Sequence, residues 1–241
     1  PTFLNLALVV TFFVWIARIA TRRQGPLVGS ALALPIIAFL AIIITSFIAG
    51  LAHASVTMTL LRRFAELILA VLTFFLVINC VRTRAQLRQL VLVLILAGFA
   101  ASLIGVVLYV LPEELAVRAL SALRFVRYPA GSGVLRYVED NPDLPLRAIS
   151  TSQDPNVLGA YLILPAMFLL QGVVTQSTAK AFRSAIGLGI ISLAVLLSFS
   201  RASWGQLIGC SAFMLVLMYL TTPTQAQRRR IVTVAIAAAV F

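Results

Sequence analysis

The chain has 241 residues, of which 61% are hydrophobic and only 11% are charged, and its mean hydropathy is +1.06. Soluble domains carry about 25% charged residues, so this balance excludes an ordinary soluble protein. The net charge of +12 does not indicate nucleic acid, because the basic residues are spread over loops between apolar stretches, where they contact phospholipid headgroups. We therefore predict an all-α polytopic membrane protein with no nucleic-acid partner.

Apolar runs of roughly the length of a membrane span recur along the chain. The run from Ile231 is too short to span, and the chain begins on Pro1, so both ends are expected to be cut. Residues 181–220 are about twice as long as a helix that crosses the bilayer and must turn near Ser198–Ser203. We predict seven to eight transmembrane helices. The seven complete runs are 2–20, 31–50, 64–81, 89–111, 155–172, 182–199 and 204–221.

Basic residues in alternate loops predict the orientation. One set of four short loops holds eleven arginines and lysines, and the other set holds eight, so the first set is cytoplasmic. The chain then divides into residues 1–111 with four spans, an outer loop at 112–154, and residues 155–241 with the remaining spans.

The outer loop begins with a helical pattern. Pro112 suits a first helical position, and Glu113 and Glu114 follow in the first turn, where the helix dipole favours anions. We predict a helix in the outer interface, or else a linker that only contacts headgroups. Residues 128–146 are rich in turn residues and are predicted to be irregular. The predicted helix has Leu115, Ala119, Leu123 and Val126 on one side, and Arg118 and Ser121 on another.

Neither a phosphate-binding glycine loop nor a zinc motif occurs, so we predict no metal and no cofactor. His53 is the one histidine, and a lone loop histidine is incidental. Cys80 and Cys210 lie in apolar runs at different depths, so we expect two buried thiols rather than a disulfide.

Arg201 opens the seventh span, and Gly205 and Gly209 follow at four-residue steps on the same helical face. The two glycines would admit a neighbouring helix, so this face is expected to point into the bundle. An arginine side chain that faces the bundle interior needs a group of opposite charge as its partner. The free amides at the start of a helix also bind anions. We predict that Arg201 binds phosphate, the alternative being a side chain that reaches outward to headgroups. Ser200 precedes it as a supporting residue.

The fifth span begins in a similar way. Asp154 is a cap residue, Pro155 suits the first turn, and Asn156 follows, with Arg147 seven residues upstream. Asp154 and Asn156 are predicted to support the site, although a helix cap with no other role remains open. Arg147 and Arg201 both map to the outer face, and two planar guanidinium groups suit a pyrophosphate.

Three further patterns predict helix contacts. Glu66 lies one turn after Arg62 and is expected to pair with it. Gly98, Ser102 and Gly105 recur at packing intervals in the fourth span, and Gly159 could admit a close neighbour in the fifth.

Two motifs carry a resemblance to a known family. Residues 147–159 read Arg-x-x-x-Thr-x-x-Asp-Pro-Asn-x-Leu-Gly, and residues 198–204 read Ser-x-Ser-Arg-x-x-Trp. The chain resembles the O-antigen ligase and O-antigen polymerase family over residues 85–221. The resemblance implies a metal-independent glycosyltransferase of the bacterial inner membrane with its active face outward. It would move a glycan from undecaprenyl pyrophosphate to an acceptor hydroxyl.

The same resemblance assigns roles. Arg147 and Arg201 would hold the pyrophosphate of the donor, the second partner would be a glycan or lipid acceptor, and membrane lipids would surround the protein. Ligases of the family carry a catalytic base in a later outer loop, so the base is expected beyond residue 241 and none is assigned. A transporter or flippase of an amphipathic lipid, and a structural subunit of a membrane complex, remain alternatives.

Overall fold

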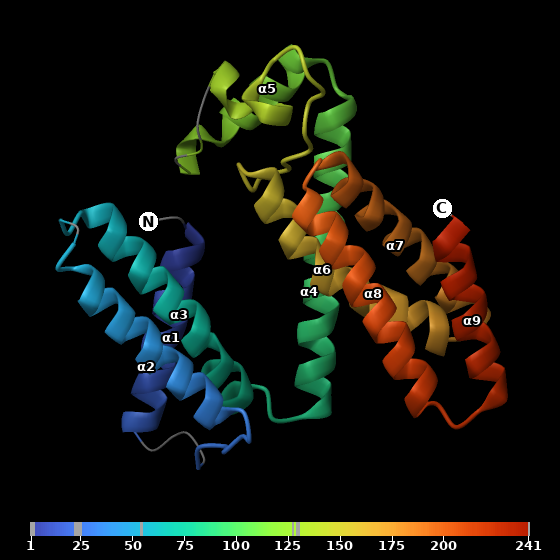
Figure 1. The fold of residues 1–241 in the computed structure, drawn as a ribbon, viewed down its shortest axis with the longest axis horizontal. Helices are drawn as coiled ribbons and strands as arrows, with labels where there is room; N and C mark the ends of the chain where they lie inside the picture. Colours follow the sequence, from blue (N-terminus) through green and yellow to red (C-terminus); the bar gives the residue numbers. More distant parts are fainter. Residues whose placement is uncertain (1–2, 22–25, 54, 127, 129–130, 241) are drawn as a thin grey trace. The chain divides into compact units, whose positions relative to one another are not determined.

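The computed structural model describes residues 3–21, 26–53, 55–126, 128 and 131–240. Within them the chain is helical, and extended backbone pairs only at an isolated bridge between Tyr137 and Leu146. The predicted all-α class is confirmed (Figure 1). The helices are α1 Phe3–Ala20, α2 Ala33–Gly50, α3 Met58–Cys80, α4 Arg84–Val110, α5 Glu113–Ser121, α6 Pro155–Thr175, α7 Thr178–Leu197, α8 Arg201–Thr221 and α9 Gln225–Val240, with 3-10 turns η1 Ala122–Val126, η2 Ser132–Val134 and η3 Val138–Asp140.

Five helices, α2, α4, α6, α7 and α8, are long and apolar enough to cross a membrane. In the described part of α1 the apolar segment is shorter, Ala7–Ala20. Helix α3 carries charged residues near its start and contains the expected ion pair, with Arg62 Nε 3.0 Å from Glu66 Oε1. Arg22, Arg23 and Arg127, which count toward the predicted orientation, lie outside the described residues.

The chain divides into two compact units, Pro1–Leu87 and Arg88–Phe241. In the first unit α1 and α2 both pack against α3. The rings of Phe47 and Phe64 stack with centroids 3.8 Å apart, and Asn79 Oδ1 accepts a hydrogen bond from the Val28 amide at 2.9 Å. These contacts join α2 and the segment before it to the two ends of α3.

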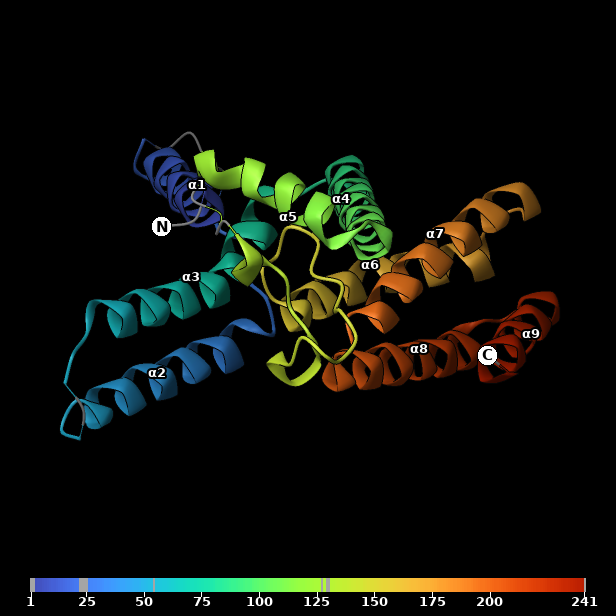
Figure 2. The ribbon, with the colours of Figure 1, turned by 90° about the horizontal axis from the view of Figure 1, so that it is seen from above.

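Helix α6 is the centre of the second unit, and α7, α8 and α9 all pack against it (Figures 1 and 2). Of its most apolar 18 residues 56% are buried, against 6% in α8, so most of the α8 surface is left for lipid. Leu158, Leu162 and Ala166 of α6 form one core with Ile191 and Val195 of α7. The central position of α6 fixes where its first turn, and the candidate site, lies.

Helix α4 packs on α6 through the small residues expected from the sequence. Gly98, Ser102 and Gly105 are all buried. A Cβ atom at Gly98 would lie 2.5 Å from Cγ of Pro165, and one at Gly105 would lie 3.4 Å from Cδ2 of Leu158. The predicted helix contact is confirmed, and it joins α4 to the C-terminal helices.

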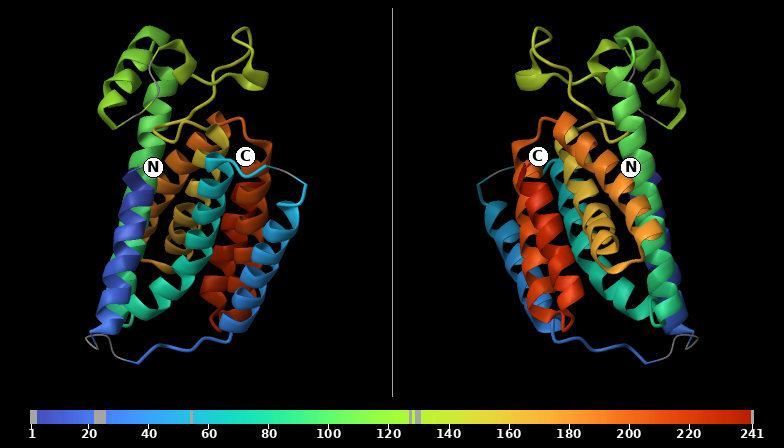
Figure 3. Two further views of the ribbon diagram at one scale, coloured as in Figure 1. Left: turned by 90° about the vertical axis from the view of Figure 1, so that its left-hand side faces the viewer. Right: turned by 90° about the vertical axis from the view of Figure 1, so that its right-hand side faces the viewer.

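Residues 112–154, the segment predicted to be outer and called the outer segment below, lie at one end of the helices of the second unit (Figure 3). Helix α5 forms where it was predicted, with Pro112 as its N-cap residue, and the backbone that follows is irregular. Ala116 and Leu120 are the buried residues of α5, whereas Leu115 and Ala119 of the predicted apolar side are exposed, so its placement in the interface stays a prediction. Ala116 and Leu120 of α5 pack in a cluster formed by residues of the loop and the end of α4, an arrangement that helical periodicity alone does not show. The cluster consists of Leu108, Ala116, Leu120, Tyr128, Val134, Leu135 and Ile149.

Cys80 and Cys210 are free thiols, as expected, but they are not buried. Both side chains lie on exposed helix faces, Cys80 at the end of α3 and Cys210 in α8.

The close packing of α4 on α6 predicts that a methyl group added at Gly98 destabilises the protein. Gly98→Ala should lower the free energy of unfolding by about 1–3 kcal/mol, because the rigid Pro165 ring cannot move aside. Thermal unfolding of the detergent-solubilised protein measures this. Gly189→Ala in α7 is the control, since its Cβ meets no atom within 4 Å and alanine favours the helix by up to about 1 kcal/mol. Equal midpoints for the two variants would contradict this packing.

Candidate functional site

The first turns of α6 and α8 lie side by side (Figures 1 and 3). A Cβ atom at Gly159 of α6 would collide with the side chain of Ser203 in α8 and would lie 3.4 Å from Ser198 Oγ. Only glycine allows the two helices to approach this closely. The close neighbour expected at Gly159 is confirmed, and the two halves of the sequence pattern meet in space.

Arg147 joins the outer loop to the turn between α7 and α8. Its Nε donates to the carbonyl oxygen of Ser198 at 2.8 Å, and its Nη2 donates to that of Phe199 at 3.4 Å and to Oδ1 of Asn156 at 3.1 Å. The Ala148 amide adds a bond to the Leu197 carbonyl at 2.8 Å. One guanidinium therefore contacts both the start of α6 and the turn that precedes α8.

The turn between α7 and α8 is held by buried hydroxyl groups. Ser200 caps α8, because its Oγ accepts bonds from the Ser203 amide at 3.3 Å and from the Ser203 hydroxyl at 2.9 Å. Ser198 Oγ donates to the Val195 carbonyl at 2.6 Å. Between them Phe199 adopts a φ of 49°, which non-glycine residues adopt rarely. The predicted turn is confirmed, and its buried polar atoms are satisfied locally.

Asp154 is the N-cap residue of α6, and its Oδ1 accepts a bond from the Asn156 amide at 2.7 Å. Asn156 in turn accepts the bond from Arg147. Both side chains are exposed at the helix start. The capping role considered for Asp154 is therefore confirmed, while Asn156 has a direct contact with the predicted phosphate-binding arginine.

Arg201 is the first residue of α8 and is exposed. The expectation that its helical face points into the bundle is not met in the described residues, because a Cβ at Gly205 or Gly209 would meet no atom within 4 Å. The close contact of α8 with α6 uses Ser203, which lies on another side of the helix. The sequence pattern of the glycines could not identify the contacting face, because serine is small enough to serve there.

The site has an excess of positive charge. The partners of Arg147 are two carbonyl groups and an amide, all neutral. Among the residues that the structure describes, no carboxylate lies within ion-pair distance of Arg147 or Arg201. The start of a helix adds the partial positive charge of its free amides. Together these groups favour an anion.

Arg136 also lies beside the site, and the sequence analysis did not select it. Its carbonyl accepts the Arg147 amide at 2.8 Å, next to the bridge between Tyr137 and Leu146. Its exposed guanidinium has Nε 3.5 Å from the carbonyl oxygen of Gln153, the residue before Asp154. Arg136 and Arg147 are eleven residues apart, and this spacing matches neither a helical nor a strand period. The backbone pairing of the two residues could therefore not be predicted from the sequence.

Two tyrosines of the outer segment have raised pKa values. Burial raises the pKa of Tyr128 above its ordinary value, and the Gln153 backbone and Arg136 only partly oppose this. Partial burial, together with the neighbouring Glu113 carboxylate, raises the pKa of Tyr137. Both hydroxyl groups are therefore protonated at neutral pH, so neither is poised to act as a general base.

Within the described ranges, no three His, Cys, Asp or Glu residues lie close enough to hold a metal ion. The chain is matched by no protein-family model, no curated protein and no solved structure. The resemblance to the O-antigen ligase and polymerase family therefore depends on the two motifs in residues 147–159 and 198–204.

The bonds of Arg147 predict a local change in stability. Arg147→Gln should increase the amide exchange rates of residues 197–201 about tenfold or more, because charged hydrogen bonds contribute roughly 1.5–3 kcal/mol. Hydrogen–deuterium exchange with peptide-level mass spectrometry measures this. Arg136→Gln is the matched control and should leave these residues unchanged, since Arg136 does not contact the turn. A similar acceleration in both variants would indicate a general effect of lost charge.

Proposed function

We propose that this chain is part of a metal-independent membrane glycosyltransferase that transfers a glycan from an undecaprenyl-pyrophosphate donor to an acceptor hydroxyl. The observation that carries the proposal is the position of Arg147, which binds the turn immediately before Arg201 through neutral acceptors only. Two arginines at adjacent helix starts, with no carboxylate paired to either in the described residues, suit a diphosphate.

The proposed mechanism is electrostatic. When the bond between the sugar and the phosphate breaks, negative charge develops on the leaving pyrophosphate. Arg147 and Arg201 would stabilise this charge, and Arg136 would add a third guanidinium at the edge of the site. Because Arg147 is held by carbonyl groups, its position is set before the donor binds, so little reorganisation is needed. No cofactor takes part in this step.

Asp154, Asn156 and Ser200 would act as positioning residues. Asp154 and Ser200 cap α6 and α8 and keep the first turns of both helices formed. Asn156 holds the guanidinium of Arg147 from the α6 side. Loss of these groups would move the arginines rather than remove a contact with the reacting atoms.

The proposal includes seven to eight membrane spans in a bacterial inner membrane, with residues 112–154 and both helix starts on the outer face. The distribution of basic residues between alternate loops supports this orientation. The acceptor is another lipid-linked glycan in a polymerase and a lipid or cell-surface glycan in a ligase. No residue is assigned as the catalytic base. A transporter of amphipathic lipids, in which the same arginines bind a headgroup, is the alternative.

The transfer reaction tests the role of Arg201. The full-length protein is reconstituted with a labelled undecaprenyl-pyrophosphate glycan and the candidate acceptors. Arg201→Ala should lower the rate of transfer about 10²–10³-fold, the typical effect of removing one group that stabilises developing charge. Chromatography of labelled products measures the rate, and product size distinguishes ligase from polymerase.

Arg118→Ala is the matched control, because Arg118 is an exposed arginine in α5 of the same outer segment. It should retain full activity at equal folded protein. If the wild-type protein moves label across the bilayer without transferring it, the transport alternative replaces the transferase. Equal activity of the Arg201→Ala and wild-type proteins would remove Arg201 from the site.

A further inference from the structure

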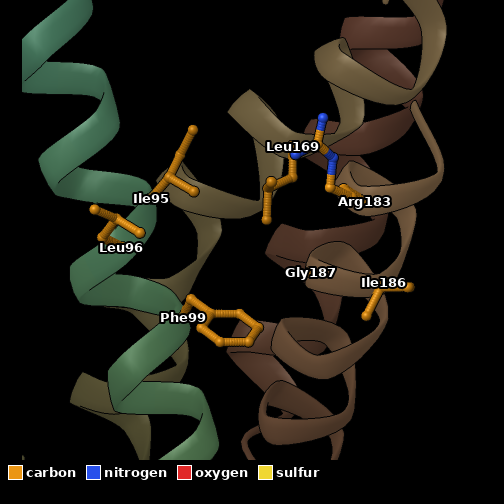
Figure 4. Close-up of a pocket in the computed structure, with 7 residues that line it drawn as sticks. All are labelled: Ile95, Leu96, Phe99, Leu169, Arg183, Ile186 and Gly187. Atoms are coloured by element: carbon orange, nitrogen blue, oxygen red, sulfur yellow. The ribbon is translucent and has the colours of Figure 1, made fainter. Parts of the chain in front are cut away.

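The second unit, Arg88–Phe241, also contains a groove that lies away from the candidate functional site. A groove of about 230 Å³ opens between α4, α6 and α7 (Figure 4). Its walls come from Ile95, Leu96, Phe99, Leu169, Ile186 and Gly187, and the remaining lining residue is Arg183. The groove is thus apolar except for one cation.

The groove opens at the surface of the second unit rather than in its core. Leu96 and Ile186, on opposite walls, are 57% and 48% exposed. A Cβ atom at Gly187 would lie 3.2 Å from Cδ1 of Leu169, so the glycine brings α7 against α6 and forms the floor. A volume of this size is below the ~300–1,000 Å³ of pockets for whole small molecules. It therefore fits part of a hydrocarbon chain.

Arg183 supplies the polar end of the groove. Its guanidinium forms no hydrogen bond or ion pair with the described residues. Arg88 is exposed on α4 and lies seven residues before Ile95, on the same side of that helix. Two cations on facing helices thus lie toward the same end of the groove, and the acidic residues of the chain are distant in sequence from both.

This end is opposite to the candidate active site. Arg183 is 15 residues before Ser198 in one helical stretch, about 22 Å along the axis. That distance is most of the hydrocarbon thickness of a bilayer, so the two sites lie toward opposite ends of α7.

We propose that the groove between α4, α6 and α7 binds an anionic phospholipid, with an acyl chain against Leu96, Phe99 and Ile186 and the headgroup phosphate on Arg183. The charge of Arg183 and the apolar walls match the two ends of such a lipid. Long basic side chains at helix ends extend to the interface, where the phosphate lies. This proposal goes beyond the transferase function and does not depend on it.

Native mass spectrometry of the detergent-solubilised protein tests the headgroup part. Phosphatidylglycerol and phosphatidylcholine with identical chains are added in turn. The wild-type protein should retain phosphatidylglycerol with higher affinity, and Arg183→Gln should lower that affinity about tenfold, as expected for a charge-assisted hydrogen bond. Arg229→Gln, which removes an exposed arginine of α9 outside the groove, should have no effect.

A second pair of variants tests the apolar part. Leu96→Trp fills the groove and should reduce phosphatidylglycerol retention, whereas Val93→Trp, at a 60% exposed position of α4 outside the lining, should not. Circular dichroism confirms equal helix content. Equal retention of both lipids, or equal effects of Arg183→Gln and Arg229→Gln, would overturn the proposal. Displacement of the phospholipid by undecaprenyl phosphate at lower concentration would assign the groove to the polyprenyl chain instead.

Discussion

The guanidinium of Arg147 is the contact on which the rest of the candidate site depends. It donates to the carbonyl groups of Ser198 and Phe199 and to the side chain of Asn156, so a single residue connects the outer loop, the start of α6 and the turn before α8. Carbonyl groups at the end of α7 have no helical partner of their own, and a cation satisfies them well. Because these acceptors are neutral, the arginine keeps its full charge for an incoming anion. The same bonds that order the loop therefore prepare the site.

The membrane environment explains why so little packing is enough to form this arrangement. Among the five candidate spans in the described residues, α6 alone has its most apolar stretch mostly buried, and α7, α8 and α9 are arranged around it. Association of helices in lipid depends on close approach of small residues rather than on removal of apolar surface from water. Gly98 against Pro165 and Gly159 against Ser203 are such contacts. They place α4 and α8 on α6, and the exposed faces of α8 remain available to lipid.

Charge is distributed so that each end of the C-terminal helices can bind a different anion. At one end Arg147 and Arg201 lie beside helix starts, with Arg136 next to them, and we propose that they bind the pyrophosphate of a lipid-linked donor. At the other end Arg183 lies at the mouth of an apolar groove, where we propose an anionic lipid. Both sites use arginine because it stays charged near a membrane and forms paired bonds to phosphate oxygens.

Composition and periodicity by themselves determined the helical membrane class, the turn near Ser198–Ser203, the pairing of Arg62 with Glu66 and the packing of Gly98 on a neighbour. These features are local, because hydrophobic length, cap residues and small-residue spacing act within one helix or one turn. Only the tertiary structure decided that Arg147 contacts the α7–α8 turn, that Arg136 pairs with the backbone of Arg147, and that α5 buries Ala116 rather than Leu115. Each of these depends on segments distant in sequence, since a helix face or a loop arginine has no preferred partner until its neighbours are in place. The same holds for the face of α8 that carries Gly205 and Gly209, which packs on no neighbour in the described residues. Small residues permit close packing but do not determine which helix face is used.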